Sequence, residues 1–308
     1  MNTLLVIDIG GTNVKFGYTL AGEPHGDHRL FQTDALRAGD PVEALAAMVR
    51  TVIDEAGLAP DLVVSTVPGF LDTDEDRVLY AGNILSLNGR RLATELSARI
   101  GRPVVLERDA VLALIGETTA GVGQGVRTAL GLFFGTGVGA AFIEDGRPFR
   151  GAGWALEVGL MPFKGEGREL PGMRKDALEG YVSGRALQHL AQQHGVPIES
   201  VFLARQDIAA LDQALDVFVR DQAFVIGTAI ALLSPEVTIL GGGLCDMAGF
   251  PRARLEALVA ANAPFAETGR AMDLRWARLG WKSALYGAPR AAAEHLRRAR
   301  PPAVTRSP

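Results

Sequence analysis

The sequence predicts an α/β protein built from two related halves. Strand-like runs alternate with helix-like runs, which is the pattern of a mainly parallel or mixed sheet covered by helices. A second observation is a repeat: an apolar strand, a glycine-threonine turn and a further strand occur at residues 4–18 and again at residues 129–143. The chain has 308 residues, more than most single cores need, so two domains are expected.

The first hairpin, residues 4–18, contains a candidate phosphate-binding turn. Gly10 and Gly11 have no Cβ, so the turn can take positive φ and bring its N–H groups, with the Thr12 hydroxyl, against phosphate oxygens. A carboxylate beside the turn would repel a nucleotide unless a cation lies between them, so Asp8 is a candidate Mg²⁺ partner, directly or through water. The alternative is an ordinary hairpin with a polar bend.

The rest of the first half follows in order. A turn at 21–23 leads into polar connecting sequence, and apolar residues at helical spacing predict a helix over 41–56 that Gly57 ends. We then expect a strand at 62–67, a helix near 92–100, a strand at 104–106 and a helix from about Ala110.

The second half begins with the repeated hairpin, in which Gly135, Thr136 and Gly137 form the turn. One Gly-Thr turn is weak evidence, but two that open successive α/β halves suggest a nucleotide clamped between domains. We expect, in order, a loop-rich segment at 147–176, helices near 178–192 and 208–233, a strand at 237–240, the glycines Gly241, Gly242 and Gly243, and a helix near 283–298. The glycine triplet either lets a flat ligand such as adenosine approach the backbone or is only a tight bend.

Composition narrows the functional classes. Hydrophobic residues make up 48% and charged residues 21%, as in an ordinary soluble enzyme. A net charge of −4 does not indicate a nucleic-acid-binding surface, and no apolar run is long enough to span a bilayer. The first strand leaves no room for a signal peptide, so the cytoplasm is the expected compartment. Cys245, the only cysteine, is interpreted as a small buried residue and not as a catalytic thiol.

Further motifs connect the two hairpins to a known family. In chain order they are Pro68-Gly69-Phe70-Leu71-Asp72, Gly82-Asn83, Glu107-Arg108-Asp109-Ala110, Glu157-Val158-Gly159, Leu178-Glu179 and Ile239-Leu240-Gly241-Gly242-Gly243. From about residue 4 to 298 the chain resembles the ROK family within the sugar-kinase, hexokinase and actin fold. Arg108, Asp145-Gly146-Arg147-Pro148-Phe149 and the segment 242–251 are most similar to D-allose kinases.

The resemblance implies a two-domain actin-like ATPase (ribonuclease H-like) fold with duplicated βββαβαβα halves and an interdomain cleft. It implies an N-terminal domain at 1–108, completed by a C-terminal helix at about 284–300, and a second domain at 109–283. We expect residues 301–308 to form a disordered tail.

The resemblance also implies roles for individual residues. Asp109 would be the general base that takes a proton from a sugar hydroxyl during transfer of the γ-phosphoryl group of ATP. Its position also permits it to cap the helix that begins at Ala110, and the two roles are compatible. The residues that would contact the sugar are Asn83, Arg108, Asp109, Glu157 and Glu179. Of these, Asn83, Glu157 and Glu179 could otherwise be surface polar residues. The residues that would hold the nucleotide are Asp8, Gly10, Gly11, Thr12, Lys15, Gly135, Thr136, Gly137, Gly241, Gly242 and Gly243, with Asp8 also near Mg²⁺.

The chain departs from the family at a structural zinc site. Many members bind zinc through a histidine and three cysteines, and without gaps these ligands fall on Leu160, Leu170, Gly172 and Ala177. All four are apolar or small, so we expect no zinc and a loop from Leu160 to 178 held by hydrophobic contacts. The missing histidine also leaves only an apolar surface toward a sugar.

The leading hypothesis is therefore a kinase that uses ATP and Mg²⁺ to phosphorylate a hexose, D-allose or another one, at a primary hydroxyl that we expect to be the 6-hydroxyl. The alternative is a catalytically weak sugar-sensing regulator without a DNA-binding domain. A kinase of the same superfold that forms acyl phosphates is a third option, which the sugar-pocket motifs weaken. A small-molecule hexose and a second copy of the chain are the expected partners, with no nucleic acid and no membrane.

Overall fold

The computed structural model describes residues 2–72, 76–164 and 174–298. These residues form two compact units, one running from the N-terminus to Gly116 and resuming at Trp281, the other running from Glu117 to Gly280. Whether these units are the domains expected from the sequence, 1–108 with 284–300 and 109–283, stays a prediction. The tail expected at 301–308 lies outside the described residues.

The first unit contains a mixed sheet with the strand order β3-β2-β1-β4-β7. Its strands are β1 (Thr3–Ile9), β2 (Asn13–Leu20), β3 (Glu23–Gln32), β4 (Leu62–Val67) and β7 (Val104–Arg108), with a separate pair β5 (Phe70–Asp72) and β6 (Arg77–Tyr80). Its helices are α1 (Asp34–Arg37), α2 (Pro41–Ala56), the 3₁₀ helix η1 (Leu85–Leu87), α3 (Leu92–Ile100), α11 (Lys282–Arg298) and most of α4 (Asp109–Thr119), whose last residues belong to the second unit.

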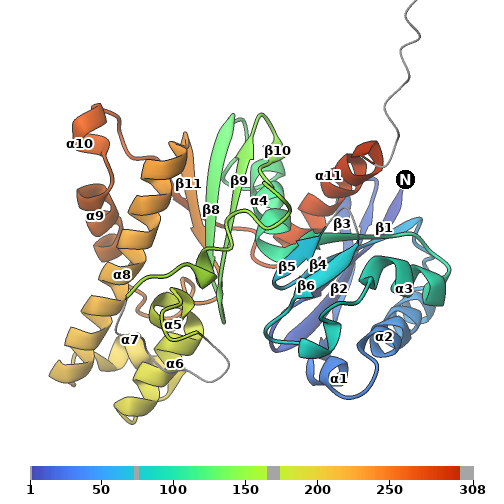
Figure 1. Cartoon of the computed structure of the whole chain (residues 1–308), viewed down its shortest axis with the longest axis horizontal. Helices are drawn as coiled ribbons and strands as arrows, with labels where there is room; N and C mark the ends of the chain where they lie inside the picture. Colours follow the sequence, from blue (N-terminus) through green and yellow to red (C-terminus); the bar gives the residue numbers. More distant parts are fainter. Residues whose placement is uncertain (1, 73–75, 165–173, 299–308) are drawn as a thin grey trace, which may run out of the picture. The chain divides into compact units, whose positions relative to one another are not determined.

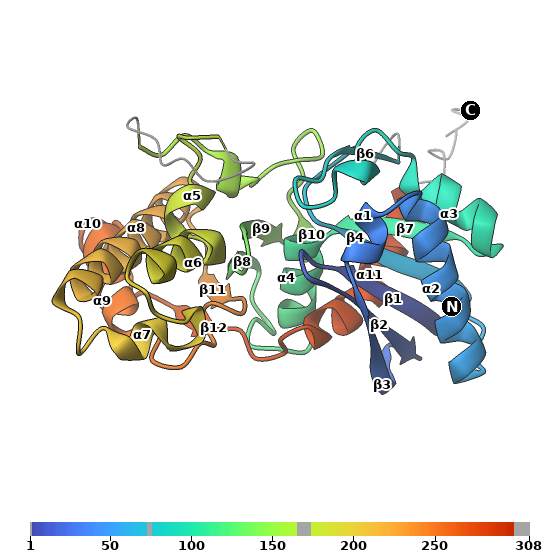
Figure 2. The same ribbon diagram turned by 90° about the horizontal axis from the view of Figure 1, so that it is seen from below.

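Helices cover both faces of this sheet, with α2 and α3 on one face and α11 on the other (Figure 1, Figure 2). The sequence sets the ends of α2, because the Asp40 carboxylate accepts the Val42 N–H at 2.9 Å and Gly57 takes a left-handed φ of 62°. Alternate residues of β1, such as Leu5 and Ile7, are fully buried in the same core as α2. The central strands β1 and β4 are buried on both sides, as their largely apolar sequences require.

The second unit repeats this topology with the strand order β10-β9-β8-β11-β12. The strands are β8 (Thr128–Phe134), β9 (Val138–Glu144), β10 (Arg147–Pro148), β11 (Val237–Gly241) and β12 (Leu274–Trp276). The helices are η2 (Val158–Leu160), α5 (Glu179–Val182), α6 (Gly184–Gln193), η3 (Ile198–Ser200), α7 (Val201–Ala204), α8 (Ala209–Leu233), α9 (Arg252–Asn262) and α10 (Phe265–Thr268). In both sheets two antiparallel pairs are followed by two parallel pairs, which confirms the predicted duplication.

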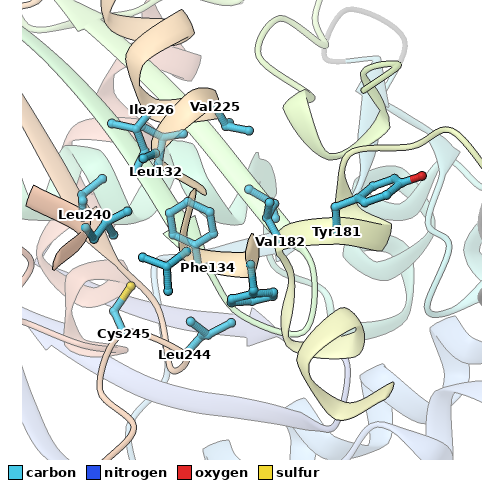
Figure 3. Packing of buried hydrophobic residues seen from close by; sticks show 14 of the residues in the cluster. Leu132, Phe134, Tyr181, Val182, Val225, Ile226, Leu240, Leu244 and Cys245 are labelled. Atoms are coloured by element: carbon cyan, nitrogen blue, oxygen red, sulfur yellow. The ribbon is translucent and has the colours of Figure 1, made fainter. Parts of the chain in front are cut away.

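The core of the second unit joins the sheet to α8 (Figure 3). Leu132 and Phe134 of β8 pack in one buried cluster with Ile226 of α8 and Leu240 of β11. Cys245 belongs to the same cluster, and burial raises its pKa to about 12. The thiol therefore stays protonated near neutral pH, in agreement with its interpretation as a small buried residue.

Some elements differ from the sequence-based expectation. The stretch expected as polar connecting sequence forms strand β3 at the sheet edge, where most of its side chains are exposed. An edge strand with no buried face lacks the apolar alternation that would have revealed it. The single helix expected at 178–192 is broken into α5 and α6 at Ser183, whose extended backbone lets its hydroxyl accept the Ala186 N–H. No helix in the described part of the chain is long and apolar enough to cross a membrane.

A buried glutamate organises one point at which the chain passes between the units. Glu117, on α4, is 1% exposed, and its carboxylate accepts the N–H groups of Arg278 and Leu279 at 2.9 Å and that of Val122 at 3.1 Å. One side chain thus fixes the backbone shortly before the chain re-enters the first unit at Trp281. Buried donors of this kind are costly to leave unpaired.

Glu117→Ala should lower the free energy of unfolding by about 3 kcal/mol, because several buried N–H groups lose their acceptor. Glu117→Gln keeps one acceptor oxygen and should lower the free energy of unfolding by less. Urea denaturation followed by circular dichroism measures both. Glu144→Ala, at a side chain that is 62% exposed, is the matched control and should be near neutral. Equal stability of Glu117→Ala and the control would contradict this role.

Candidate active site

The turn between β1 and β2 has its carbonyl groups held from one side. The Thr33 hydroxyl donates to the Gly10 carbonyl at 2.8 Å, Arg37 Nη2 donates to the Gly11 carbonyl at 2.6 Å, and the Thr33 N–H donates to the Thr12 carbonyl at 3.0 Å. All these donors come from the chain at the start or end of α1. The direction of each peptide group in the turn is therefore fixed by this short helix.

This arrangement leaves N–H groups of the turn available. In a trans peptide the N–H points opposite to the preceding carbonyl, so the N–H groups of Gly11 and Thr12 point away from α1. Neither has a hydrogen-bond partner among the described residues. The expected positive φ is wrong for Gly10, whose backbone is not left-handed; a Cβ at Gly10 would instead lie 3.1 Å from the Asn13 carbonyl oxygen. Glycine supplies room here, not an unusual φ.

Asp8 lies immediately before the turn and is oriented by Thr66 of β4. The Ile9 N–H donates to Thr66 Oγ1 at 2.8 Å, and this hydroxyl in turn donates to Asp8 Oδ1 at 3.2 Å. Lys15 Nζ is 3.9 Å from the other carboxylate oxygen. Burial raises the pKa of Asp8, while the Lys15 charge and the Thr66 hydrogen bond lower it. A carboxylate held in this way suits a cation, directly or through water.

Asp109 is the first residue of α4, at the end of β7. Its carboxylate accepts the Ala110 N–H at 2.7 Å, so it also has a structural role at this helix start. The Asp109 side chain is exposed, but desolvation of its carboxylate by the surrounding protein raises its pKa, the Ala110 hydrogen bond lowers it, and the nearby charge of Asp8 raises it further. A raised pKa moves a carboxylate toward the range in which a general base works efficiently. Arg108, beside it, is buried at 3% exposure.

Asn83 lies in the loop between β6 and η1 and is half-buried. Its backbone carbonyl accepts a hydrogen bond from Arg37 Nε at 2.9 Å. The loop that carries Asn83 and the turn at Gly11 are therefore held by the same side chain.

The second turn, between β8 and β9, has the same organisation with different donors. The N–H of Gly184 donates to the Gly135 carbonyl at 2.8 Å, and the N–H of Arg185 donates to the Thr136 carbonyl at 3.3 Å. These donors are the first two residues of α6. The N–H groups of Thr136 and Gly137 consequently point away from α6, and neither has a partner within the described parts of the chain. In both units, two successive amides are thus presented by a Gly-Thr turn.

The structure brings Glu179 and this second turn together. A Cβ on Gly137 would lie 2.7 Å from a Glu179 carboxylate oxygen, and one on Gly159 would lie 2.9 Å from it. Only glycine fits at these two positions without a shift of the carboxylate. Glu157, two residues before Gly159, is half-buried, and Leu156 beside it has an unusual φ of 67°.

The glycine triplet after β11 divides into two kinds of position. Gly242 has a φ of 94°, and a Cβ there would lie 2.3 Å from the Phe134 carbonyl oxygen, so this glycine is required by the bend. A Cβ on Gly241 would lie 2.7 Å from Ala277 Cβ. Gly243, in contrast, faces open space. The bend accounts for Gly242 and the close approach of Ala277 for Gly241, so Gly243 is the one with open space beside it.

The segment in which the family has its zinc ligands is closed at its described ends by other contacts. Pro162 forms an antiparallel bridge with Ala177, and the Phe163 ring packs edge-to-face on Tyr181 at 5.6 Å. Lys164 Nζ lies 2.7 Å from a carboxylate oxygen of the buried Asp221. Leu170 and Gly172 lie outside the described residues. The described residues include no group of three or more His, Cys, Asp or Glu that could hold a metal.

Sequence reasoning missed the residues that hold the turns. Thr33 and Arg37 lie in a stretch with no motif, and Gly184 and Arg185 lie within what looked like continuous helix. Thr66 was interpreted only as part of a strand. Their partners are distant in sequence, so no local pattern could reveal them.

The comparisons with known proteins agree with this fold. An N-acetyl-D-glucosamine kinase of Erwinia tasmaniensis is 28% identical over 263 residues, covering 78% of this chain and 83% of the relative. A ROK family glucokinase from Streptomyces griseus, solved with glucose and AMPPNP, has a TM-score of 0.80 and 25% identity, over 95% of this chain and 100% of that one. A ROK hexokinase from Thermus thermophilus has a TM-score of 0.78 and 26% identity, over 96% and 100%.

The family model described as "ROK family" matches residues 4–294, nearly the whole length. Together with the duplicated sheets and their paired Gly-Thr turns, this match means that the chain belongs to the ROK family.

Proposed function

We propose that this protein transfers the γ-phosphoryl group of ATP to a hydroxyl of a hexose, the 6-hydroxyl. The observation that carries the proposal is the pair of Gly-Thr turns, each with carbonyls held from behind and two successive N–H groups available. Such groups suit phosphate oxygens. The named activities of the relatives, N-acetyl-D-glucosamine kinase and glucokinase, support the same class of reaction.

In this proposal the nucleotide is bound by the amides of Gly11, Thr12, Thr136 and Gly137, with its adenosine beside Gly243. Asp8 and Lys15 lie at the phosphate end, and Asp8 would hold Mg²⁺ directly or through water. When bound, Mg²⁺ neutralises charge on the phosphates.

Asp109 would accept the proton of the attacking sugar hydroxyl. Its raised pKa makes the carboxylate a better proton acceptor than an ordinary aspartate. The buried Arg108 next to it favours the ionised form, since its charge lowers the pKa of Asp109. Asn83, Glu157 and Glu179 would hold other sugar hydroxyls.

The relatives and the sequence motifs point to different hexoses. The two kinds of relative suggest an N-acetylhexosamine or glucose, whereas Arg108 and the 145–149 stretch suggested allose. Leu160, half-buried at the end of η2, offers only apolar contact where many family members have histidine. We also propose that the protein acts in the cytoplasm as a homodimer, as the family resemblance suggests.

A coupled ATP-turnover screen tests the activity directly. The panel contains D-allose, glucose, mannose, fructose, N-acetyl-D-glucosamine and N-acetyl-D-mannosamine, each with Mg²⁺ and ATP. At least one sugar should stimulate ADP formation well above the sugar-free rate, and mass and NMR analysis should place the phosphate on the 6-hydroxyl. No stimulation by any sugar would contradict the kinase and favour a sugar-sensing protein.

Asp109→Asn should lower kcat by about 10²- to 10⁴-fold, because it removes the proton acceptor, and should leave the Kd for AMPPNP unchanged. Asp207→Asn, at an exposed position in the second unit, is the matched control. Because the pKa of Asp109 is raised above 3.8, its charge destabilises the folded state above that pH. The variant should therefore be more thermostable than wild type at pH 7, with the difference shrinking as pH falls toward 3.8 and vanishing below it. Wild-type kcat in the variant would remove Asp109 from the chemistry.

We also propose that the segment 160–178 folds without zinc. Protein purified in metal-free buffer should contain far less than one zinc per chain by elemental analysis, and a strong chelator should leave the melting temperature unchanged. Near-stoichiometric zinc, or a large drop in melting temperature with the chelator, would refute this.

A further inference from the structure

We propose that Arg37 is a positioning residue that couples nucleotide binding to sugar binding within the first unit. One guanidinium group connects the phosphate-binding turn, through the Gly11 carbonyl at 2.6 Å, to the candidate sugar loop, through the Asn83 carbonyl at 2.9 Å. This inference rests on the proposed function, since it assigns one ligand to each of these two loops.

The geometry of the side chain suits this task. Arg37 uses Nη2 for Gly11 and Nε for Asn83, while Nη1 is paired with the Asp34 carboxylate. A guanidinium is planar and its donors keep fixed directions, so a displacement of one acceptor changes the hydrogen bond to the other. A lysine, with a single ammonium group on a flexible chain, would not transmit direction in this way.

Contacts of the neighbouring residues hold α1, and with it the backbone of Arg37, in place. Leu36 is fully buried, and its carbonyl accepts the Ser86 hydroxyl at 2.8 Å, so α1 is also bonded to η1 in the loop that follows Asn83. On the other side, Thr33 holds the carbonyls of Gly10 and Thr12. Arg37 adds a link in which a single side chain reaches both loops.

The consequence for ligands follows from peptide geometry. The bond from Arg37 sets the direction of the Gly11 carbonyl and therefore of the Thr12 N–H, which is offered to phosphate. A sugar that orders the Asn83 loop would order Arg37, and so would prepare the Thr12 N–H. By linkage the effect is reciprocal: sugar should tighten nucleotide binding by the same factor by which nucleotide tightens sugar binding.

A role in overall stability is expected to be small. The Arg37 side chain is 39% exposed and its ion-pair partner Asp34 is 82% exposed, and exposed pairs contribute little to folding. Loss of coupling can therefore be measured in a protein that is still folded.

The experiment uses calorimetric titration of the full chain with Mg-AMPPNP, with and without a saturating sugar taken from the turnover screen. In wild type the sugar should tighten AMPPNP binding by a factor within the usual range of about 5- to 150-fold. In Arg37→Met this factor should fall close to one, and AMPPNP alone should bind about 10-fold more weakly. Arg37→Lys should lose most of the coupling while it keeps the charge.

Arg50→Met is the matched control, because Arg50 on α2 is also exposed and ion-paired, to Glu43 at 2.7 Å, and contacts neither loop. It should keep the wild-type coupling, and all three variants should melt within a few degrees of wild type. An unchanged coupling factor in Arg37→Met would overturn the inference and leave the kinase assignment intact. A wild-type protein that binds no sugar would overturn both, and the screen would already have revealed it.

Discussion

The direction of the amides in the two Gly-Thr turns depends on the hydrogen bonds that the carbonyl groups of these turns accept. When the carbonyl of a peptide group accepts a hydrogen bond from the protein, the direction of that peptide group is fixed. Its N–H is then still available to a ligand. The Gly11 and Thr12 amides are oriented by the carbonyls of Gly10 and Gly11, which accept hydrogen bonds from Thr33 and Arg37, and the Thr136 and Gly137 amides by the carbonyls of Gly135 and Thr136, which accept from the first amides of α6. These hydrogen bonds give the available amides a set direction, which lowers the cost of ordering on binding, and in the coupling proposed above a sugar on the Asn83 loop would hold the Thr12 amide more firmly.

The two halves reach this arrangement with different chemistry. The first unit uses a hydroxyl, a backbone amide and a guanidinium, whereas the second uses only backbone amides at a helix start. Side-chain donors can be exchanged by mutation and can connect to a second loop, as Arg37 does with Asn83. Backbone donors cannot. This difference explains why the coupling proposed above lies in the first unit.

Much of the fold could be predicted because its signals are local. The helix over 41–56 had a proline start and a glycine end, and β4 was a short run of apolar and hydroxyl-bearing residues that stops before Pro68, so both have the expected bounds. Strand β3 was missed because an exposed edge strand has no apolar face. The turns were located from Gly-Thr, but their donors Thr33, Arg37 and Gly184 were not, because a hydrogen bond across 20 or more residues leaves no local pattern. The hydrogen bond from Thr66 to Asp8 could not be predicted for the same reason.

The central claim is that the Gly11 and Thr12 amides bind nucleotide phosphate. Amide ¹H and ¹⁵N chemical shifts of isotope-labelled protein, followed during titration with Mg-AMPPNP, test it at the atoms concerned. We predict that the Gly11 and Thr12 resonances move downfield, among the largest shifts in the first unit, and saturate with the calorimetric Kd. Binding of the nucleotide with both resonances unmoved would contradict the account.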